Sequence, residues 1–546
     1  MVDSTKKEVD IDSILLELGE FGRYQIKNFI LICIGIIVVS EMSLTYVFTA
    51  GILQYRCNIP GCDQEPYSFS EPWVFNAIPD TNGIRDKCTQ FKQVFVPEHP
   101  DVCNNTGMFD HSNKVTCTDF IYDTDELTLQ NEFNLTCDNE WKLTLIGTIN
   151  NAGLFFFMAT MGILSDKFGR RTVYIYSLFA GAIAGTIKSF SVNYVMYAIF
   201  EFIDSSLVSG TYAIAFVLAM EMLGPSKRVI GGILIACSYT IGEVLVGFIA
   251  MYALNFRLLI RIVYCPMILV LIYFWLIPES VRWLWVNGKS KAVIDVVLKA
   301  ADANKITLKD DTLQLIYSCG IEPRTSLEAQ SPKTAETSEK RKEMKKVFRS
   351  RILLLRIAKC FLVWMTCAFV YYGLSLNAVS LAGNKFLNFM LVCAAEIPGY
   401  FITNLLSGRI GRKWTLSLSL FVCGLSCLGT QYIPMGESTM GKLSLFFVGK
   451  AAITVSFTVL YVFTSEMFPT SLRNSLVLIC STVGRIGSMS APQTPLLAKY
   501  VPALPLLLFG GLAILSGFTV LLFPETLNTS LPDTIEEAEN IGKKKI

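Results

Sequence analysis

Long apolar stretches recur along the chain and alternate with polar segments. Twelve of them, each roughly 20 residues long, reach the length that a helix needs to cross the hydrocarbon core of a bilayer. We expect these helices at 24–49, 143–163, 172–190, 194–220, 229–254, 258–277, 352–376, 386–406, 414–432, 443–464, 475–498 and 503–523. The pattern predicts an all-α membrane protein with twelve transmembrane helices, embedded in a lipid bilayer.

Polar segments divide these helices into two sets of six. Residues 51–142 form a long polar insert within the first set, and residues 285–351 form a lysine-rich linker between the sets. The predicted parts are an N-terminus at 1–23, a first half at 24–284, the linker, a second half at 352–526 and a tail at 527–546. Because an excess of lysine and arginine marks cytoplasmic loops, we expect the linker and both termini in the cytoplasm.

Composition narrows the class of protein. Of the 546 residues, 52% are hydrophobic and 17% are charged, whereas soluble domains carry about a quarter charged residues. The net charge of +2 says little about partners, but no basic tract is interleaved with aromatic residues, so nucleic acid is not an expected partner. The polar N-terminus does not read as a cleavable signal peptide, so we expect the first helix to direct membrane insertion.

The insert carries six of the sixteen cysteines: Cys57, Cys62, Cys88, Cys103, Cys117 and Cys137. An even number in a polar segment is typical of disulfides in an oxidising compartment, and the fifteen possible pairings stay open. A metal site is the alternative, since His99 and His111 also lie here, but no Cys-x-x-Cys spacing accompanies them. Asn104 and Asn134 begin glycosylation sequons, which likewise predict that the insert lies outside the cell.

Three short motifs recur in both halves at nearly the same distance. Gly-Arg-Arg at 169–171 matches Gly-Arg-Lys at 411–413, Glu-Met at 221–222 matches 466–467, and Pro-Glu at 278–279 matches 524–525. The offsets are 242, 245 and 246 residues, and in each half the motifs close the second, fourth and sixth predicted helices. We therefore expect a duplicated bundle with a substrate site between its halves, near the middle of the membrane.

The ends of these helices carry fixed charges of both signs. We expect ion pairs between the halves to hold the cytoplasmic mouth shut and to break when the halves rock, because desolvation offsets much of the attraction in a partly buried pair. The residues of this predicted gate are Asp166, Arg170, Arg171, Glu221, Arg228, Glu279, Arg282, Arg412, Glu466, Arg473 and Glu525. The alternative is that these charges only anchor helix ends.

Several motifs resemble those of known transporters. Residues 162–171 (GILSDKFGRR) are similar to the loop between helices 2 and 3 of the major facilitator superfamily, and 407–413 (SGRIGRK) is a weaker copy. Residues 18–25 (LGEFGRYQ), 278–284 (PESVRWL), 464–474 (TSEMFPTSLRN) and 524–539 (PETLNTSLPDTIEEAE) together resemble solute carrier family 22. Residues 46–57 (YVFTAGILQYRC) are similar to insect members of that family that resemble organic cation transporters.

The resemblance implies the major facilitator fold, with twelve helices in two related halves, and a plasma-membrane carrier that works by alternating access. It implies neither an enzyme nor a cofactor, and it leaves the oligomeric state open. Two positions depart from the family pattern. Gly408 stands where the second-half loop normally has an acid, and Glu201 stands where the fourth helix usually has arginine.

Ionisable side chains inside membrane spans are costly and are therefore candidates for function. The predicted spans contain Glu41, Glu201, Asp204, Glu243, Glu396, Lys450 and Arg485. Aromatic faces on the seventh helix attract quaternary ammonium groups and add to this set. The predicted substrate-binding residues are Trp364, Tyr371, Tyr372, Glu243, Glu396, Lys450 and Arg485.

Arg485 bears on the charge of the substrate. The resemblance implies aspartate at this position in the family's cation transporters and arginine in its anion and zwitterion transporters. Arg485 and Lys450 together would repel a purely cationic substrate unless Glu243 or Glu396 neutralises their charges. The alternative is that Arg485 pairs internally with an acid and does not meet the substrate. The expected substrate is a small organic cation or a carnitine-like zwitterion. An organic anion carried by exchange, and a receptor that does not transport, are the alternatives.

Overall fold

The computed structural model describes residues 11–65, 67–81, 84–96, 103–309, 343–433, 439–470, 472–527, 529, 531–532 and 534–541. Predictions for residues 1–10, for His99, for 310–342 of the linker and for the end of the tail lie outside this part of the chain.

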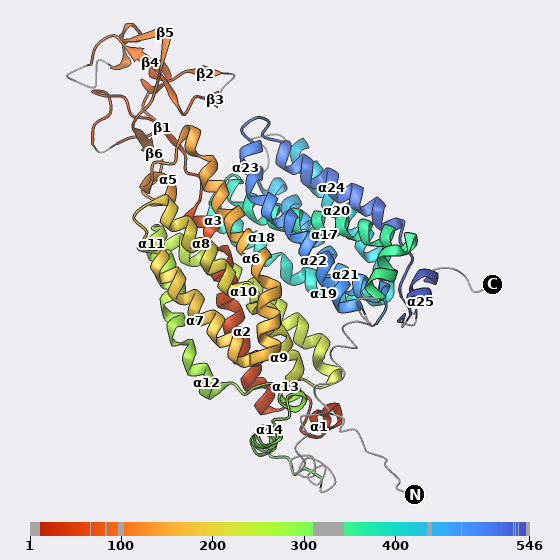
Figure 1. The fold of residues 1–546 in the computed structure, drawn as a ribbon. Helices are drawn as coiled ribbons and strands as arrows, with labels where there is room; N and C mark the ends of the chain where they lie inside the picture. Colours follow the sequence, from red (N-terminus) through yellow and green to blue (C-terminus); the bar gives the residue numbers. More distant parts are fainter. Residues whose placement is uncertain are drawn as a thin grey trace, which may run out of the picture.

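Twelve helical segments form the bundle within the described residues (Figure 1). Eight run without a break: α6 (Trp141–Phe168), α7 (Arg170–Lys188), α10 (Arg228–Ala253), α17 (Arg351–Asn377), α20 (Arg412–Tyr432), α21 (Thr439–Met467), α22 (Arg473–Ser490) and α24 (Leu504–Leu521). Four are interrupted: α2 (Arg23–Leu44) with α3 (Tyr46–Thr49), α8 (Tyr194–Val208) with α9 (Thr211–Met222), α18 (Lys385–Ala394) with α19 (Glu396–Arg409), and α11 (Phe256–Tyr264) with the 3-10 helix η5 (Cys265–Ile272) and α12 (Tyr273–Leu276).

Local chemistry accounts for three of the interruptions. Pro266 lacks the backbone N–H that an α-helix needs, and the chain runs as η5 from the residue before it. The Thr45 hydroxyl donates to the Glu41 carbonyl (2.6 Å) at the break between α2 and α3, where it competes with the helical backbone. Gly210 separates α8 from α9 and lies against α6, since a Cβ there would be 2.6 Å from the Cβ of Met161.

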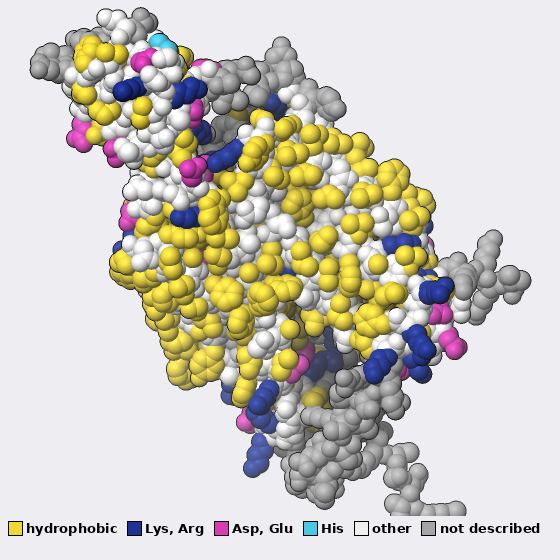
Figure 2. Space-filling model, turned by 45° about the horizontal axis from the view of Figure 1, so that its top comes forward, with side chains coloured by type: hydrophobic (Ala, Val, Ile, Leu, Met, Phe, Trp, Pro, Cys, Tyr) yellow, Lys and Arg dark blue, Asp and Glu magenta, His cyan; other side chains and the backbone are white. Residues whose placement is uncertain are grey.

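The surface of the bundle is that of a membrane protein. By length and composition, ten of the twelve segments are suited to span a membrane, while α7 (19 residues) and α22 (18 residues) are more polar. Apolar side chains cover the sides of the bundle, and charged side chains gather toward its two ends (Figure 2). These observations confirm the predicted all-α membrane fold.

The same turn occurs at equivalent places in the two halves. Gly169 links α6 to α7 with φ 104°, and Gly411 links α19 to α20 with φ 97°, a backbone that favours glycine. A glutamate caps the following helix each time: Glu279 accepts from the Arg171 N–H, and Glu525 accepts from the Arg412 N–H, both at 3.0 Å. The internal repeat read from the sequence is therefore also a structural repeat.

The insert projects from one end of the bundle, which we call the insert side (Figure 1). Its described residues form three antiparallel strand pairs: β1 (Tyr55–Cys57) with β6 (Phe120–Tyr122), β2 (Asp80–Thr81) with β3 (Ile84–Arg85), and β4 (Thr89–Gln93) with β5 (Phe109–Thr116). Disulfides join Cys57 to Cys117, Cys62 to Cys103 and Cys88 to Cys137, which confirms the predicted framework and selects one of its fifteen pairings.

At the opposite end of the bundle, which we call the termini side (Figure 1), the described residues form four short helices. These are α1 (Ile11–Glu17), α13 (Val281–Val286), α14 (Ser290–Asn304) and α25 (Ile535–Asn540). Ile14 and Leu18 pack with Trp283, Leu284 and Val297 into a small apolar core outside the main bundle. Two larger apolar cores lie inside the bundle, one mostly in the first half and one in the second. The first also includes Leu376, Phe386, Phe389, Cys393 and Ala491 of the second half, so the two halves pack against each other through apolar side chains.

Candidate functional site

A buried ion pair lies at the centre of the molecule, where α21 faces α19. Lys450 Nζ lies 2.7 Å from Glu396 Oε1, and neither side chain is exposed at all. Lys450 also donates to Ser375 Oγ (2.8 Å) and to the Tyr371 carbonyl (3.3 Å), and its ammonium lies 3.4 Å from the centroid of the Tyr371 ring. The positive charge of Lys450 is thus already neutralised within the second half.

Glu396 accepts further hydrogen bonds through its other oxygen. Oε2 receives the hydroxyls of Tyr371 (2.8 Å), Tyr400 (3.0 Å) and Thr240 (3.2 Å). Thr240 belongs to α10 in the first half, whereas the other donors belong to the second half. The pair therefore also joins the halves at mid-height. Both Glu396 and Lys450 were predicted to bind substrate. The structure brings them together, but in this conformation they form an ion pair with each other.

Glu243 lies one turn beyond Thr240 on α10, beside this pair. Its side chain is 1% exposed and contacts the Glu396 carboxyl and the Cys393 thiol. Its Oε2 atom has no hydrogen-bond partner among the described residues. Buried polar atoms are rarely left without a partner, so this oxygen marks a place where a ligand or a proton belongs.

Arg485 on α22 has no carboxylate partner within the described part of the chain. Its guanidinium donates to the Tyr372 hydroxyl on α17 at 3.1 Å. Tyr239 on α10 lies in electrostatic range of both Arg485 and Glu243, and it therefore bridges the space between these two charges. In this conformation Arg485 is not withdrawn into an internal ion pair.

Four tyrosines from four helices surround this position, and we call them the tyrosine cluster: Tyr212 (α9), Tyr239 (α10), Tyr372 (α17) and Tyr461 (α21). The rings of Tyr212 and Tyr239 are 5.3 Å apart, and Tyr212 neighbours Tyr372 and Tyr461 across the halves. Sequence reasoning selected only Tyr372, because single tyrosines in apolar helices carry no signal that separates a pocket from packing.

The predicted aromatic residue Trp364 lies behind this cluster. Its indole is 1% exposed, donates to Thr464 Oγ1 (3.0 Å) and packs edge-on against Tyr461 at 4.5 Å between centroids. Tyr461 is 40% exposed although its neighbours come from several helices, so it presents a free aromatic face. Trp364 supports Tyr461 in this conformation rather than offering its own face.

A cavity of about 280 Å³ opens on the termini side along α9. Its lining residues are Phe216, Val217, Met220, Glu221, Arg228 and Arg282. Tyr212, Phe216 and Met220 are spaced four residues apart and therefore lie on one face of α9. The cavity and the tyrosine cluster thus share one helix face, with the cluster at the deeper end.

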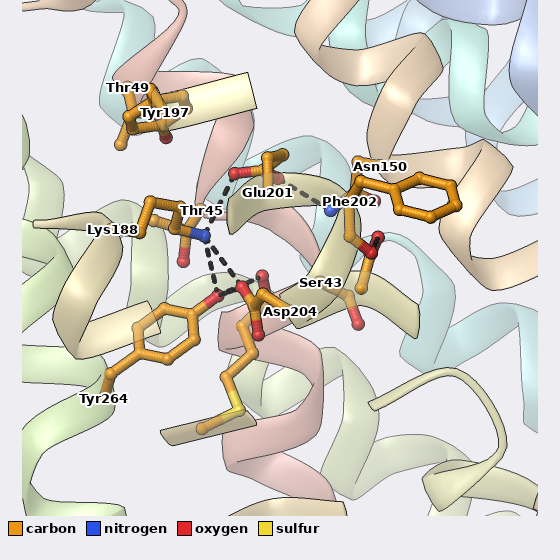
Figure 3. Close-up of polar contacts among 12 residues, drawn as sticks. Ser43, Thr45, Thr49, Asn150, Lys188, Tyr197, Glu201, Phe202, Asp204 and Tyr264 are labelled. Carbon is orange, nitrogen blue, oxygen red and sulfur yellow. Dashed lines mark hydrogen bonds and ion pairs between the residues drawn. The ribbon is translucent and has the colours of Figure 1, made fainter. Parts of the chain in front are cut away.

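A second buried charge cluster lies within the first half, toward the insert side (Figure 3). Lys188 Nζ lies 2.7 Å from Asp204 Oδ2 and 3.0 Å from Glu201 Oε2, with every side chain at most 3% exposed. The Tyr264 hydroxyl donates to Asp204 (2.5 Å), and Asn150 Nδ2 donates to Glu201 Oε1 (2.8 Å). Lys188 supplies the partner that the sequence left open for Glu201, and sequence reasoning had overlooked it.

The predicted gate residues lie at the termini side, and the ion pairs described among them join residues of the same half. Arg170 pairs with Asp166 (2.9 Å) and lies 3.7 Å from Glu221, while Arg412 pairs with Glu466 (3.2 Å). The Arg171 side chain donates to the carbonyls of α12, and Arg473 donates to Thr470. The predicted ion pairs between the halves, which would close the cytoplasmic mouth, therefore remain a prediction for a different conformation.

On the insert side the halves contact each other directly. Thr144 and Thr148 of α6 hydrogen-bond to Gln493 (3.0 and 2.8 Å), and a Cβ on Gly147 would lie 2.7 Å from Pro492. Ion pairs between Lys385 and Glu126 and between Lys499 and Glu140 also cross the interface. The insert side is thus closed in this conformation, while the described charge pairs at the termini side do not bridge the halves.

Comparison with known proteins agrees with this architecture. Residues 127–492 match the Major Facilitator Superfamily. The chain is 31% identical to a Drosophila melanogaster protein named Organic cation transporter protein, over 98% of this chain and 95% of that one. It is 29% identical to Organic cation/carnitine transporter 2 of Mus musculus, over 97% and 94% of the two chains.

A further relative is Solute carrier family 22 member 21 of Mus musculus, 30% identical over 98% of this chain and 94% of that one. Among solved structures, the xylose transporter XylE from E. coli in a partially occluded inward open conformation gives a TM-score of 0.59 at 14% identity, covering 93% of this chain and all of that one. This likeness shows the fold alone. The chain therefore belongs to the major facilitator superfamily and, within it, to solute carrier family 22, whose members are membrane transporters and not enzymes.

Proposed function

We propose that the chain is a plasma-membrane transporter of small organic cations or zwitterions. The observation that carries this proposal is the buried Glu243 carboxyl, which has a free oxygen beside the tyrosine cluster. A carboxylate attracts an ammonium group, and tyrosine faces add cation–π attraction of about 0.5–2 kcal/mol per contact. The relatives named for organic cations and carnitine support the same class of substrate.

Arg485 favours a zwitterion within this class. Lys450 is neutralised by Glu396, so Glu243 and Arg485 are the ionisable groups left beside the tyrosine cluster, one acidic and one basic. An ammonium at Glu243 and a carboxylate at Arg485 would satisfy both. Transport of organic anions by exchange is the second candidate. It rests on the guanidinium of Arg485, which donates to the Tyr372 hydroxyl and has no carboxylate partner among the described residues.

We further propose that the termini side faces the cytoplasm, so that this conformation is inward-facing. Closure of the insert side by contacts between the halves supports this. In the outward-facing state the charges at 166–171, 221, 412 and 466 would pair across the halves. Asn104 and Asn134 are both exposed, which suits glycosylation outside the cell.

The test is a substrate panel in cells that express the chain, repeated with Arg485→Asp. Uptake of labelled tetraethylammonium, carnitine and a dicarboxylate is measured. We expect carnitine uptake to fall at least tenfold in the variant while tetraethylammonium uptake rises, because a repulsive charge becomes an attractive one. Asp138→Asn, on the exposed insert, is the matched control and should change none of the three.

Each alternative predicts a different pattern. Uptake confined to the dicarboxylate, and lost in Arg485→Asp, would favour organic anion exchange. Equal effects on all three probes would mean that Arg485 does not face the substrate. Absence of saturable uptake of any probe, with normal amounts of protein at the cell surface, would favour a receptor that does not transport.

A further inference from the structure

The central cluster contains one more carboxyl group than it has cations to balance. The cation of this cluster is the Lys450 ammonium group, which contacts Glu396. Glu243 lies against the same Glu396 carboxyl group. All three side chains are at most 1% exposed. An ionised carboxylate without a partner is strongly disfavoured in such a dry environment, so the excess negative charge must be removed while the site is empty.

The hydrogen bonds show which carboxyl can change its charge. Glu396 has one oxygen on Lys450 and three hydroxyl donors on the other, an environment that stabilises its ionised form. Glu243 has no donor on Oε2 and adjoins another carboxyl. Two carboxyl groups in contact cannot both be ionised at low cost, so the proton belongs on Glu243.

The groups that face Glu243 come from every element packed around it. They are Glu396 and Tyr400 from α19, Lys450 from α21, Cys393 from α18, Tyr371 from α17 and Tyr239 from α10 itself. On α2, the Ile37 carbonyl and Ser40 pack against Gly242, the residue before Glu243, and the carboxyl group of that helix is Glu41, which follows Ser40 and is 7% exposed. Lys450 is the one cation in this set, and it is held by Glu396.

We propose that Glu243 exchanges its proton for the ammonium group of the substrate, so that the protein is a proton-coupled cation exchanger. This rests on the proposed function. When the substrate arrives, the O–H bond of the Glu243 carboxyl breaks, the proton passes to water on the open side, and the carboxylate pairs with the ammonium. When the substrate leaves on the other side, Glu243 takes up a proton there. No group is oxidised or reduced.

This scheme has a consequence that separates it from passive transport. One cation moves one way and one proton moves the other way, so the cycle carries no net charge. A membrane potential then has no effect on the uptake of a monovalent cation, whereas it drives a uniporter directly. A difference of one pH unit, acid inside, instead drives about tenfold accumulation, because one unit corresponds to 1.36 kcal/mol.

The experiment uses the full chain reconstituted in liposomes. Uptake of labelled tetraethylammonium is measured with the interior one pH unit more acid, with no gradient, and with a potassium diffusion potential at equal pH. We expect transient accumulation of about tenfold with the pH gradient and no response to the potential. Saturable uptake that follows the potential and ignores the pH gradient would overturn the proton exchange and leave the proposed function intact. No saturable uptake at all would count against the proposed function.

Two variants assign the proton to Glu243. In Glu243→Gln we expect any residual uptake to be independent of the pH gradient, and a preserved gradient response would overturn the assignment. If Glu243→Gln is inactive, Glu243→Asp decides: restored uptake driven by the gradient supports a titrating carboxyl at this place, and failure to restore it overturns the proposal. Glu132→Gln is the matched control, because Glu132 is paired with Arg257 on the insert side and should leave both uptake and its gradient response unchanged.

Discussion

The lysine at position 188 holds two carboxylates together inside the first half (Figure 3). In Lys188→Met, Glu201 and Asp204 would face each other in a dry environment without a cation. Removal of one partner from a buried pair costs about 3–5 kcal/mol. We expect this variant to unfold at a clearly lower temperature in detergent and to reach the cell surface in reduced amounts.

The matched control for this variant is Lys167→Met, which removes an exposed lysine at the tip of the α6–α7 turn. The triple variant Lys188→Met, Glu201→Gln, Asp204→Asn removes all three charges and should recover much of the lost stability. An unchanged unfolding temperature in Lys188→Met would show that the lysine does not stabilise the first half.

Three features at the scale of single residues could not be predicted from the sequence. Lys188 lies two residues from the end of its apolar stretch, where a lysine usually extends its ammonium into the membrane interface, so nothing marked it as buried. Glu396 and Lys450 were both selected, but their pairing depends on how α19 meets α21. The tyrosine cluster draws on four helices and has no counterpart in any continuous stretch of sequence.

At the scale of whole elements, the turns at Gly169 and Gly411 allow consecutive helices to reverse direction. A side chain at Gly169 would require a strained backbone, and its Cβ would lie 2.2 Å from Oε2 of Glu279, the carboxyl group whose Oε1 caps α7. Such backbone strain costs of order 1–3 kcal/mol before any clash is counted. We expect Gly169→Ala and Gly411→Ala each to lower thermal stability in detergent and transport in cells.

Each of these helix–turn–helix segments contains a second glycine, just before the turn, that serves as a control. A Cβ on Gly162 or Gly408 would meet no atom within 4 Å among the described residues. Both lie inside helices, where alanine is favoured over glycine by up to about 1 kcal/mol. Gly162→Ala and Gly408→Ala should therefore be neutral or slightly stabilising, and equal damage from all four substitutions would refute the special role of the turns.

Helices were the most predictable elements of this chain. Length and hydropathy alone place them, so the expected first helix at 24–49 differs by one residue from the observed Arg23–Thr49. The breaks within helices were not predicted, because a glycine or a threonine inside an apolar stretch gives no sign of which neighbour it will meet. The disulfide pairing likewise depends on strand pairing in the insert, which places Cys57 opposite Phe120, three residues after Cys117.

At the scale of the whole molecule, the two halves share one interface, and the contacts at its two ends differ. The insert side is closed by α6 against Gln493 and Pro492 and by two ion pairs. The central pair joins the halves through Thr240 and Glu396, and at the termini side the Arg170–Asp166 and Arg412–Glu466 pairs each lie within one half. Rotation of the halves about the central pair would separate the contacts on the insert side and bring the charges on the termini side together.

This rotation predicts that a covalent link across the insert side stops transport. In Thr144→Cys with Gln493→Cys, the two positions are joined by a short bis-methanethiosulfonate reagent, which forms a disulfide with each cysteine and releases methanesulfinate. We expect uptake of tetraethylammonium to fall at least tenfold and to return after reduction. The unsubstituted chain, treated in the same way, accounts for the native cysteines and disulfides. Glu132→Cys with Arg257→Cys places the same link on the insert side but within one half, and it should leave uptake intact. Undiminished uptake in the first variant, with the link verified by mass spectrometry, would mean that the halves do not separate there during transport, and a rocking mechanism would then be untenable.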